Sequence, residues 1–183
     1  MDEMYKKAYD KQEDKVAAII KTALLEGKSM KDIGALIMQL KHITGLAKTR
    51  VMIDDTIEWL ENSPNDAEKM TLFHHHIDVG DNLQEGDGVY EGLDKYLTEN
   101  GYNKSLRLFG GKSPEERDYI INSFKNNVKN RILIASTLAS GEGLNIQFCQ
   151  NAGMLERQWN PQNEEQAELR LSLIHISEPT RPY

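Results

Sequence analysis

Short apolar runs of five or six residues recur along the second half of the chain and are separated by segments of helical character. Apolar runs this short suit strands that are buried on both faces of a parallel sheet. The predicted strands cover residues 70–75, 105–109, 131–135 and 151–156. Their alternation with helices predicts an α/β fold in which helices flank a parallel sheet.

Three helices are predicted to accompany these strands. Residues 89–99 form one, which Asn100 and Gly101 end. Ser113-Pro114-Glu115-Glu116 combines an N-cap serine, a proline in the first turn and a capping-box glutamate, so a second helix is predicted to run to about residue 127. Residues 162–170, rich in Glu and Gln, read as the start of a third.

The N-terminal third of the chain has a different pattern, with apolar residues at helical spacing and no strand-like run. It predicts separate helices over residues 3–26, 30–41 and 49–61. The turn-forming stretch 62–66 then reads as a linker. Residues 1–66 are therefore expected to be a helical appendage and linker in front of the α/β domain.

A polar loop follows the strand at residues 131–135. In open α/β sheets, ligands bind at the carboxyl ends of the strands. Gly141 and Gly143 would let the backbone approach a phosphate closely, and the hydroxyls of Ser136, Thr137 and Ser140 could donate to phosphate oxygens. Such loops also occur as simple turns, so the loop alone does not decide between the two interpretations.

Three segments carry a more specific signal. TLASGEGLNIQFC, LERQWNP and EEQAELR resemble motifs V and VI of the SWI/SNF-type DNA-dependent ATPases of helicase superfamily two, and their spacing also fits. Upstream, SLRLFGGKSPEERDYIINSF and KMTLFHHHIDVGDNL resemble the preceding elements of the same RecA-like lobe. LKHITGLAKTRVMIDDTIEWLE resembles the helical linker before it, as in the annealing-helicase and phage-like branch. The resemblance implies a second, C-terminal RecA-like lobe over residues 67–170.

The resemblance also implies roles for individual residues. In the motif V loop, Gly141, Glu142, Gly143 and Asn145 would sense nucleotide and couple it to DNA, while Gln166 and Arg170 would face the nucleotide cleft. Contacts with DNA phosphate are expected from Thr137, Ser140, Gly110, Gly111 and Lys112. The acidic helix positions beside Gln166 are read as a solvated face.

The last motif departs from the family pattern Gln-x-x-Gly-Arg-x-x-Arg. Gln166 and Arg170 match it, but Leu169 stands in place of the glycine and Leu173 in place of the second arginine, the arginine finger. LSLIHISEPTR at 171–181 can be back-translated into a sequence that resembles a transposon adapter of sequencing libraries. Residues 171–183 are therefore interpreted as a non-native tail and the motif as truncated, the alternative being a natural tail.

Two parts of an ATP site are absent from the sequence. It has no Gly-x-x-x-x-Gly-Lys-Ser/Thr loop and no Asp-Glu pair closing an apolar strand, which in the family belong to the first lobe. ATP and Mg²⁺ are thus expected only in an intact two-lobe protein, with none bound and no ATP hydrolysed by this chain alone. The expected partners are the missing first lobe and double-stranded or forked DNA.

Composition sets further limits. A formal net charge of −7 argues against a dedicated nucleic-acid scaffold, although a local DNA footprint in a groove shared by two lobes is compatible with it. The single cysteine, Cys149, excludes an internal disulfide and is expected to be a small buried hydrophobe. No apolar run is long enough to span a membrane, so a cytoplasmic location, or a nuclear one in a eukaryote, is expected.

His74-His75-His76 could suggest a metal site. A strand would send His74 and His76 to one face and His75 to the other, and no cysteine or suitably spaced carboxylate lies nearby in the sequence, so no metal is predicted. The resemblance instead places the triplet at the carboxyl end of the first strand, toward the other lobe.

The function predicted from the sequence is the second motor lobe of an ATP-dependent double-stranded-DNA translocase or annealing helicase. Two alternatives remain. The chain could be a non-catalytic module that binds DNA or a protein, or the lobe of another superfamily-two enzyme such as an RNA helicase.

Overall fold

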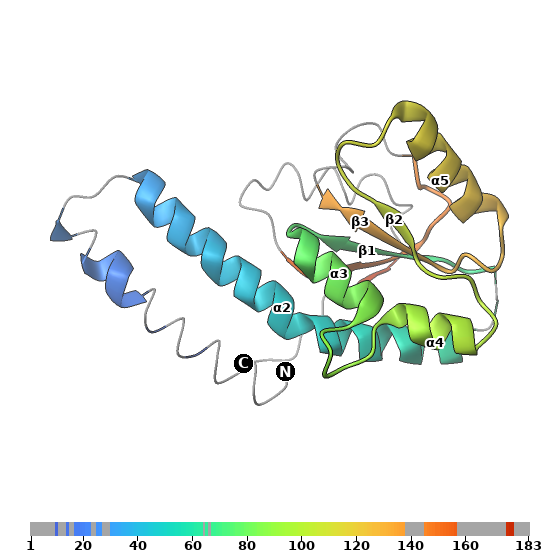
Figure 1. Ribbon diagram of the computed structural model, residues 1–183, viewed down its shortest axis with the longest axis horizontal. Coiled ribbons are helices and arrows are strands. Elements are labelled where there is room, and N and C mark those ends of the chain that lie inside the picture. The colour runs from blue at the N-terminus through green and yellow to red at the C-terminus, as the bar shows by residue number, and fades with distance from the viewer. Residues whose placement is uncertain are drawn as a thin grey trace.

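The computed structural model describes residues 17–22, 25–26, 30–63, 65, 67–137, 145–156 and 175–177, together with residues 10 and 14. A single parallel sheet, with strand order β2-β3-β1-β4-β5, forms its centre (Figure 1). The strands are β1 (Met70–His74), β2 (Leu106–Leu108), β3 (Ile132–Ser136), β4 (Asn151–Met154) and β5 (His175–Ser177). The helices are α2 (Met30–Asn62), α3 (Ile77–Glu85), α4 (Leu93–Glu99) and α5 (Pro114–Asn126).

Two apolar layers cover the two faces of the sheet, as expected for strands of continuous hydrophobic sequence. One layer packs residues of α2, α3 and α4 against β1 and β3, with Leu72 and Ile134 fully buried. The other packs Phe124 of α5 against Phe73 and Leu133. Every residue of β1 and β3 is buried, and all strand pairs are parallel. The predicted α/β fold with a RecA-like parallel sheet is confirmed.

Helix α2 is one continuous helix of 33 residues, and the prediction of separate helices at 30–41 and 49–61 is wrong. Nothing between those ranges stops a helix, because Gly45 is helix-compatible although unfavourable by about 1 kcal/mol. The first part of α2 extends beyond the sheet, and the second part lies beside α3 and α4 (Figure 1). Of the predicted helix 3–26, residues 17–22 are helical, and most of the rest lies outside the described residues.

The predicted helix at 89–99 is shorter than expected. It begins at Leu93, because Asp87 accepts hydrogen bonds from the backbone N–H groups of Val89 and Tyr90 and holds them in a turn. The helix after Ser113 has the predicted capping box, in which the Ser113 hydroxyl accepts from the Glu116 N–H and the Glu116 carboxylate accepts from the Ser113 N–H.

Three residues of the C-terminal tail take part in the sheet. His175–Ser177 pairs with β4 in parallel register as the outermost strand. The sequence predicts no strand in the tail, because residues 171–183 are interpreted as non-native and lie outside the predicted lobe. The non-native origin of residues 171–183 stays a prediction.

Arg131 precedes β3 and is completely buried, which is rare for a charged side chain. Its Nε donates to the Glu68 carbonyl over 2.7 Å, and Nη1 donates to the Tyr102 hydroxyl over 3.2 Å. The guanidinium carbon also lies 5.3 Å from the ring centre of Trp59 on α2 and 5.2 Å from that of Tyr102. Arg131 therefore contacts α2 through a cation–π interaction and holds the segments before β1 and β2 through hydrogen bonds.

His74, the last residue of β1, is also completely buried. Its Nδ1 donates to the His76 carbonyl over 2.8 Å, which fixes the tautomer of the neutral ring. The ring lies against α3, where a Cβ on Gly80 would come within 2.6 Å of Nε2. Burial lowers the pKa of His74 from its usual 6.5, and the nearby Arg107 charge lowers it further, only partly opposed by the His76 carbonyl and Glu156.

We expect Arg131→Met to lower the free energy of unfolding by about 2–4 kcal/mol, because the variant leaves the Glu68 carbonyl and the Tyr102 hydroxyl without their charged donor. Urea unfolding followed by circular dichroism measures this. Lys129→Met is the control, since Lys129 is exposed two residues earlier. Equal stability of the two variants would contradict the structural role of Arg131.

We expect the free energy of unfolding to fall as the pH drops below about 6.5. The unfolded chain protonates His74 near that pH, whereas the lowered pKa keeps the folded ring neutral, so the unfolded state binds more protons in this range. His74→Gln keeps an amide donor for the His76 carbonyl and removes the titration, and its stability should depend less on pH between 7.5 and 5. Urea unfolding at several pH values measures how steeply the free energy of unfolding changes with pH. Identical slopes in the wild type and His74→Gln would show that His74 does not cause the pH dependence.

Candidate functional site

The candidate site lies at the carboxyl edge of the sheet, where the central strands end together. His74 of β1 pairs with Ser136 of β3, and Phe73 pairs with Met154 of β4. Because all strands are parallel, the segments that leave β1, β3 and β4 start from the same edge. Ligands of open α/β sheets bind at this edge.

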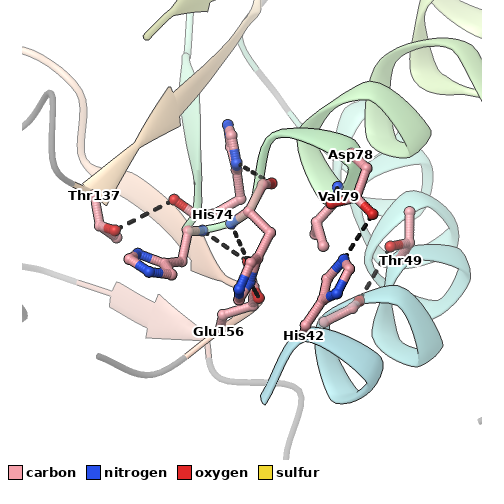
Figure 2. Close-up of polar contacts among 10 residues, drawn as sticks. His42, Thr49, His74, Asp78, Val79, Thr137 and Glu156 are labelled. Carbon is pink, nitrogen blue, oxygen red and sulfur yellow. Dashed lines mark hydrogen bonds and ion pairs between the residues drawn. The ribbon is translucent and has the colours of Figure 1, made fainter. Parts of the chain in front are cut away.

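Glu156 is nearly buried at this edge, with 1% of its side-chain surface exposed. Its Oε2 accepts hydrogen bonds from the backbone N–H groups of His75, over 2.7 Å, and His76, over 2.9 Å. Its Oε1 lies 2.5 Å from His76 Nδ1. A carboxylate from the end of β4 thus holds the chain that leaves β1 (Figure 2).

The same carboxylate completes the start of α3. His76 is the N-cap residue of α3, and its own side chain makes no capping hydrogen bond. A negative charge at a helix N-terminus is favourable, because the backbone N–H groups there point at it and the helix dipole is positive there. Glu156 therefore serves as a cap supplied from a distant strand.

Two histidines extend this arrangement to α2. The ring centres of His42 and His76 lie 4.4 Å apart, and His42 Nε2 is 2.6 Å from Oδ2 of Asp78 in the first turn of α3. The His42–Asp78 pair is partly exposed and adds little stability alone. Together the contacts form a polar chain that joins β4, the end of β1, α3 and α2 (Figure 2).

His75 lies beside this chain, and its pKa is lowered, first by burial and then by the neighbouring His76. The triplet does not alternate between two faces as predicted, because β1 ends at His74 and the next two residues bend away from strand geometry. Its predicted place at the carboxyl end of the first strand is confirmed. Within the described ranges, no three His, Cys, Asp or Glu side chains are grouped so that they could hold a metal ion.

Two predicted site residues near motif V belong to the described chain. Thr137 is buried, and its hydroxyl donates to the His74 carbonyl over 3.3 Å, so it ties the end of β3 to the end of β1. Asn145 is exposed. Their roles in DNA contact and nucleotide coupling stay predictions. The other predicted site residues of motifs V and VI lie outside the described residues: Ser140, Gly141, Glu142, Gly143, Gln166 and Arg170.

The loop between β2 and α5 carries the other predicted DNA contacts. Gly110 and Gly111 are exposed, and a Cβ on either would meet nothing within 4 Å. Gly111 has φ +85°, which glycine adopts without strain. Lys112 follows, with part of its side chain exposed. An open backbone beside a lysine at the carboxyl edge of the sheet is compatible with a phosphate contact, and the contact itself stays a prediction.

Sequence reasoning missed Glu156, Gly45 and His42 as site residues. The sequence places Glu156 at the end of the predicted strand 151–156 and within the LERQWNP segment, and neither signal shows its contacts with His75 and His76. Cys149 is buried as predicted; burial raises the pKa of its thiol, and the Thr71 hydroxyl donates to its sulfur over 3.3 Å. No helix within the described chain is long and apolar enough to cross a membrane.

Comparison with known proteins identifies relatives of this lobe. An uncharacterized ATP-dependent helicase of Mycoplasma pneumoniae is 27% identical over all of this chain and 17% of its own length. The human DNA annealing helicase and endonuclease ZRANB3 is 28% identical over 80% of this chain and 12% of its own length. The chain thus spans less than a fifth of these relatives.

Solved structures share the fold. The C-terminal domain of the Sulfolobus solfataricus SWI2/SNF2 ATPase superposes with a TM-score of 0.68 at 20% identity, covering 96% of this chain and 73% of that domain. The core of the same ATPase in complex with dsDNA gives 0.64 at 18% identity, over 96% of this chain and 36% of that one.

The match at family level covers residues 49–172, which include the sheet from β1 to β4 and most of the loops at its carboxyl edge. It extends over more than half of the chain and agrees with the resemblance to the second lobe of SWI/SNF-type superfamily-two ATPases. The chain belongs to the family of the helicase conserved C-terminal domain.

Proposed function

We propose that this chain is the second motor lobe of an ATP-dependent translocase that moves on double-stranded DNA, with an annealing helicase as the nearest functional type. One observation carries the proposal. Residues 49–172 match a helicase domain, and the loops predicted to meet DNA or nucleotide leave the parallel sheet at its carboxyl edge.

In such a motor, ATP closes two lobes around the nucleotide, and repeated closing and opening moves the lobes along the DNA backbone. This chain lacks the phosphate-binding loop and the acidic pair of a first lobe, so most of the ATP and Mg²⁺ site would belong to a separate first lobe. The motif V loop would couple nucleotide binding to DNA binding through Gly141, Glu142, Gly143 and Asn145. The nucleotide cleft would be faced by Gln166 and Arg170. ATP supplies the phosphoryl group whose transfer drives the cycle.

The DNA contact would use backbone and lysine rather than a broad basic face. Gly110 and Gly111 leave the backbone open, and Lys112 adds one positive charge beside them. A local contact of this kind fits a chain of net charge −7, because a groove shared by two lobes divides the phosphate contacts between them. Location in the cytoplasm, or in the nucleus of a eukaryote, is part of this proposal.

We expect this chain alone to hydrolyse no ATP. Joined to a first lobe that carries the phosphate-binding loop, and with residues 171–183 replaced by the family's remaining motif VI, it should hydrolyse ATP when duplex DNA is added. Arg170→Ala should then lower kcat by about 10²–10³-fold, because a cation expected to face the nucleotide cleft is lost. Phosphate release measures the rate, with Lys129→Ala as a control of equal charge change.

Two results would count against this proposal. Stimulation by RNA and not by duplex DNA would favour an RNA helicase. A joined protein that binds DNA and never hydrolyses ATP would favour a non-catalytic binding module.

We expect Lys112→Ala in the joined protein to weaken duplex binding by about three- to tenfold at low salt and to reduce the slope of log K against log salt by about one unit, because one phosphate contact is removed. Fluorescence anisotropy at several salt concentrations measures both. Lys129→Ala is the matched control, since Lys129 lies in the turn before β3, at the opposite edge of the sheet. Equal losses in both variants would show that Lys112 acts only through net charge.

A further inference from the structure

The loop at residues 110–112 lies between two residues whose side chains are held in place. Ser113, at its far end, begins α5 with the capping box, in which Ser113 and Glu116 each accept a hydrogen bond from the other's backbone N–H. Phe109, at its near end, is half-buried. A Cβ on Gly110 or Gly111 would meet nothing within 4 Å. The contacts of Phe109 therefore decide how this open loop begins.

Arg107 of β2 packs on the ring of Phe109. Its guanidinium carbon lies 4.1 Å from the ring centre, which is within cation–π range. Nη2 of Arg107 donates to Oδ1 of Asp81 on α3, and 21% of the Arg107 side chain is exposed. Nε is buried and has no hydrogen-bond partner among the described residues. The Phe109 ring and Asp81 thus provide the contacts that hold the guanidinium in place.

His74 contacts the same ring from the end of β1. The ring centres of His74 and Phe109 lie 5.7 Å apart in an edge-to-face arrangement. His74 is itself fixed, because its Nδ1 donates to the His76 carbonyl and its own carbonyl accepts from Thr137. Burial and the Arg107 charge lower the pKa of His74, so the ring packs there in its neutral form. Phe109 is therefore held by β1 and β2 directly, and by α3 through Arg107.

Arg107 is poorly suited to a phosphate contact of its own, because its charge is already paired with Asp81 and most of its side chain is buried. Lys112 is partly exposed, and it is the residue of this loop that could bring a positive charge to a phosphate. A loop that is already ordered loses less conformational entropy on binding than one that must first be ordered. Anchoring of Phe109 would therefore strengthen a phosphate contact made by Lys112.

We propose that Arg107 and Phe109 are positioning residues for DNA binding: Arg107, held by Asp81, fixes Phe109 and thereby orders residues 110–112, so that Lys112 can meet a DNA phosphate. The DNA contact rests on the proposed function, whereas the order of the loop does not. Neither Arg107 nor Phe109 touches DNA in this role. Both act through the backbone between Phe109 and Ser113.

Nuclear magnetic resonance relaxation of the backbone ¹⁵N nuclei in the full chain tests the order of the loop. Phe109→Leu and Arg107→Gln should each lower the order parameters of residues 110–112 from about 0.85 to below about 0.6, with the middle of α5 unchanged. Phe109→Tyr should keep the wild-type values, because it retains the ring that Arg107 and His74 contact. The control is Lys104→Gln, which removes the same charge from an exposed position before β2.

Unchanged order parameters of residues 110–112 in both Phe109→Leu and Arg107→Gln would overturn the proposal. Lower order parameters throughout the chain, with the middle of α5 included, would show that the two residues only stabilise the fold, and would overturn it too. These measurements need neither DNA nor nucleotide, so their outcome is independent of the proposed motor activity.

Duplex binding by the joined two-lobe protein tests the consequence. Phe109→Leu should weaken binding about three- to fivefold, but less than about twofold when Lys112 is already replaced by alanine, because the contact that the ordered loop supports is then absent. Fluorescence anisotropy measures both losses. Equal losses with and without Lys112 would overturn the positioning role. If Lys112→Ala alone left binding unchanged, the proposed DNA contact would be refuted, and the relaxation data would still decide whether Arg107 and Phe109 order the loop.

Discussion

The parallel sheet imposes the main constraint on this structure. β1 is central and hydrogen-bonded on both sides, and every residue of β1 and β3 is buried. Such strands must be covered on both faces, which α5 does on one side and α2, α3 and α4 do on the other. Parallel direction also brings the strand ends to one edge, where the chain bends sharply and its backbone groups need new partners. The candidate site is located at that edge.

The polar groups at this edge come from distant parts of the chain. Thr137 satisfies the His74 carbonyl, and Glu156 satisfies the N–H groups of His75 and His76. Unpaired backbone groups at a buried strand end would each cost stability comparable to a lost hydrogen bond. The side chains that fix the ends of these strands are therefore structural.

Local signals predicted the fold well. The capping box at Ser113 and the apolar strand runs depend on residues close together in the sequence, so the pattern contains all the information that forms them. The same reasoning failed where the structure depends on contacts between residues that are far apart in the sequence. The burial of Arg131 depends on Trp59 and Tyr102, which lie far from it in the sequence. Helix α2 continues through Gly45, where the sequence predicts a break between two helices. Glu156 has partners 80 and 81 residues away, which no local pattern shows.

The candidate site also has one part that the sequence predicts and one part that depends on tertiary contacts. Motif V, motif VI and the Gly110–Lys112 loop were recognised because their residue types and spacing are read from the sequence alone, and the described loop does leave the predicted edge. The chemistry of these motifs depends on where they point, and this depends on contacts that the motifs do not contain. The contact of Gly45 with Glu156 is an example, because Gly45 lies in the helix before the family match and far from Glu156 in the sequence. A buried carboxylate held by fixed backbone donors connects these elements more rigidly than a partly exposed ion pair such as His42–Asp78 does.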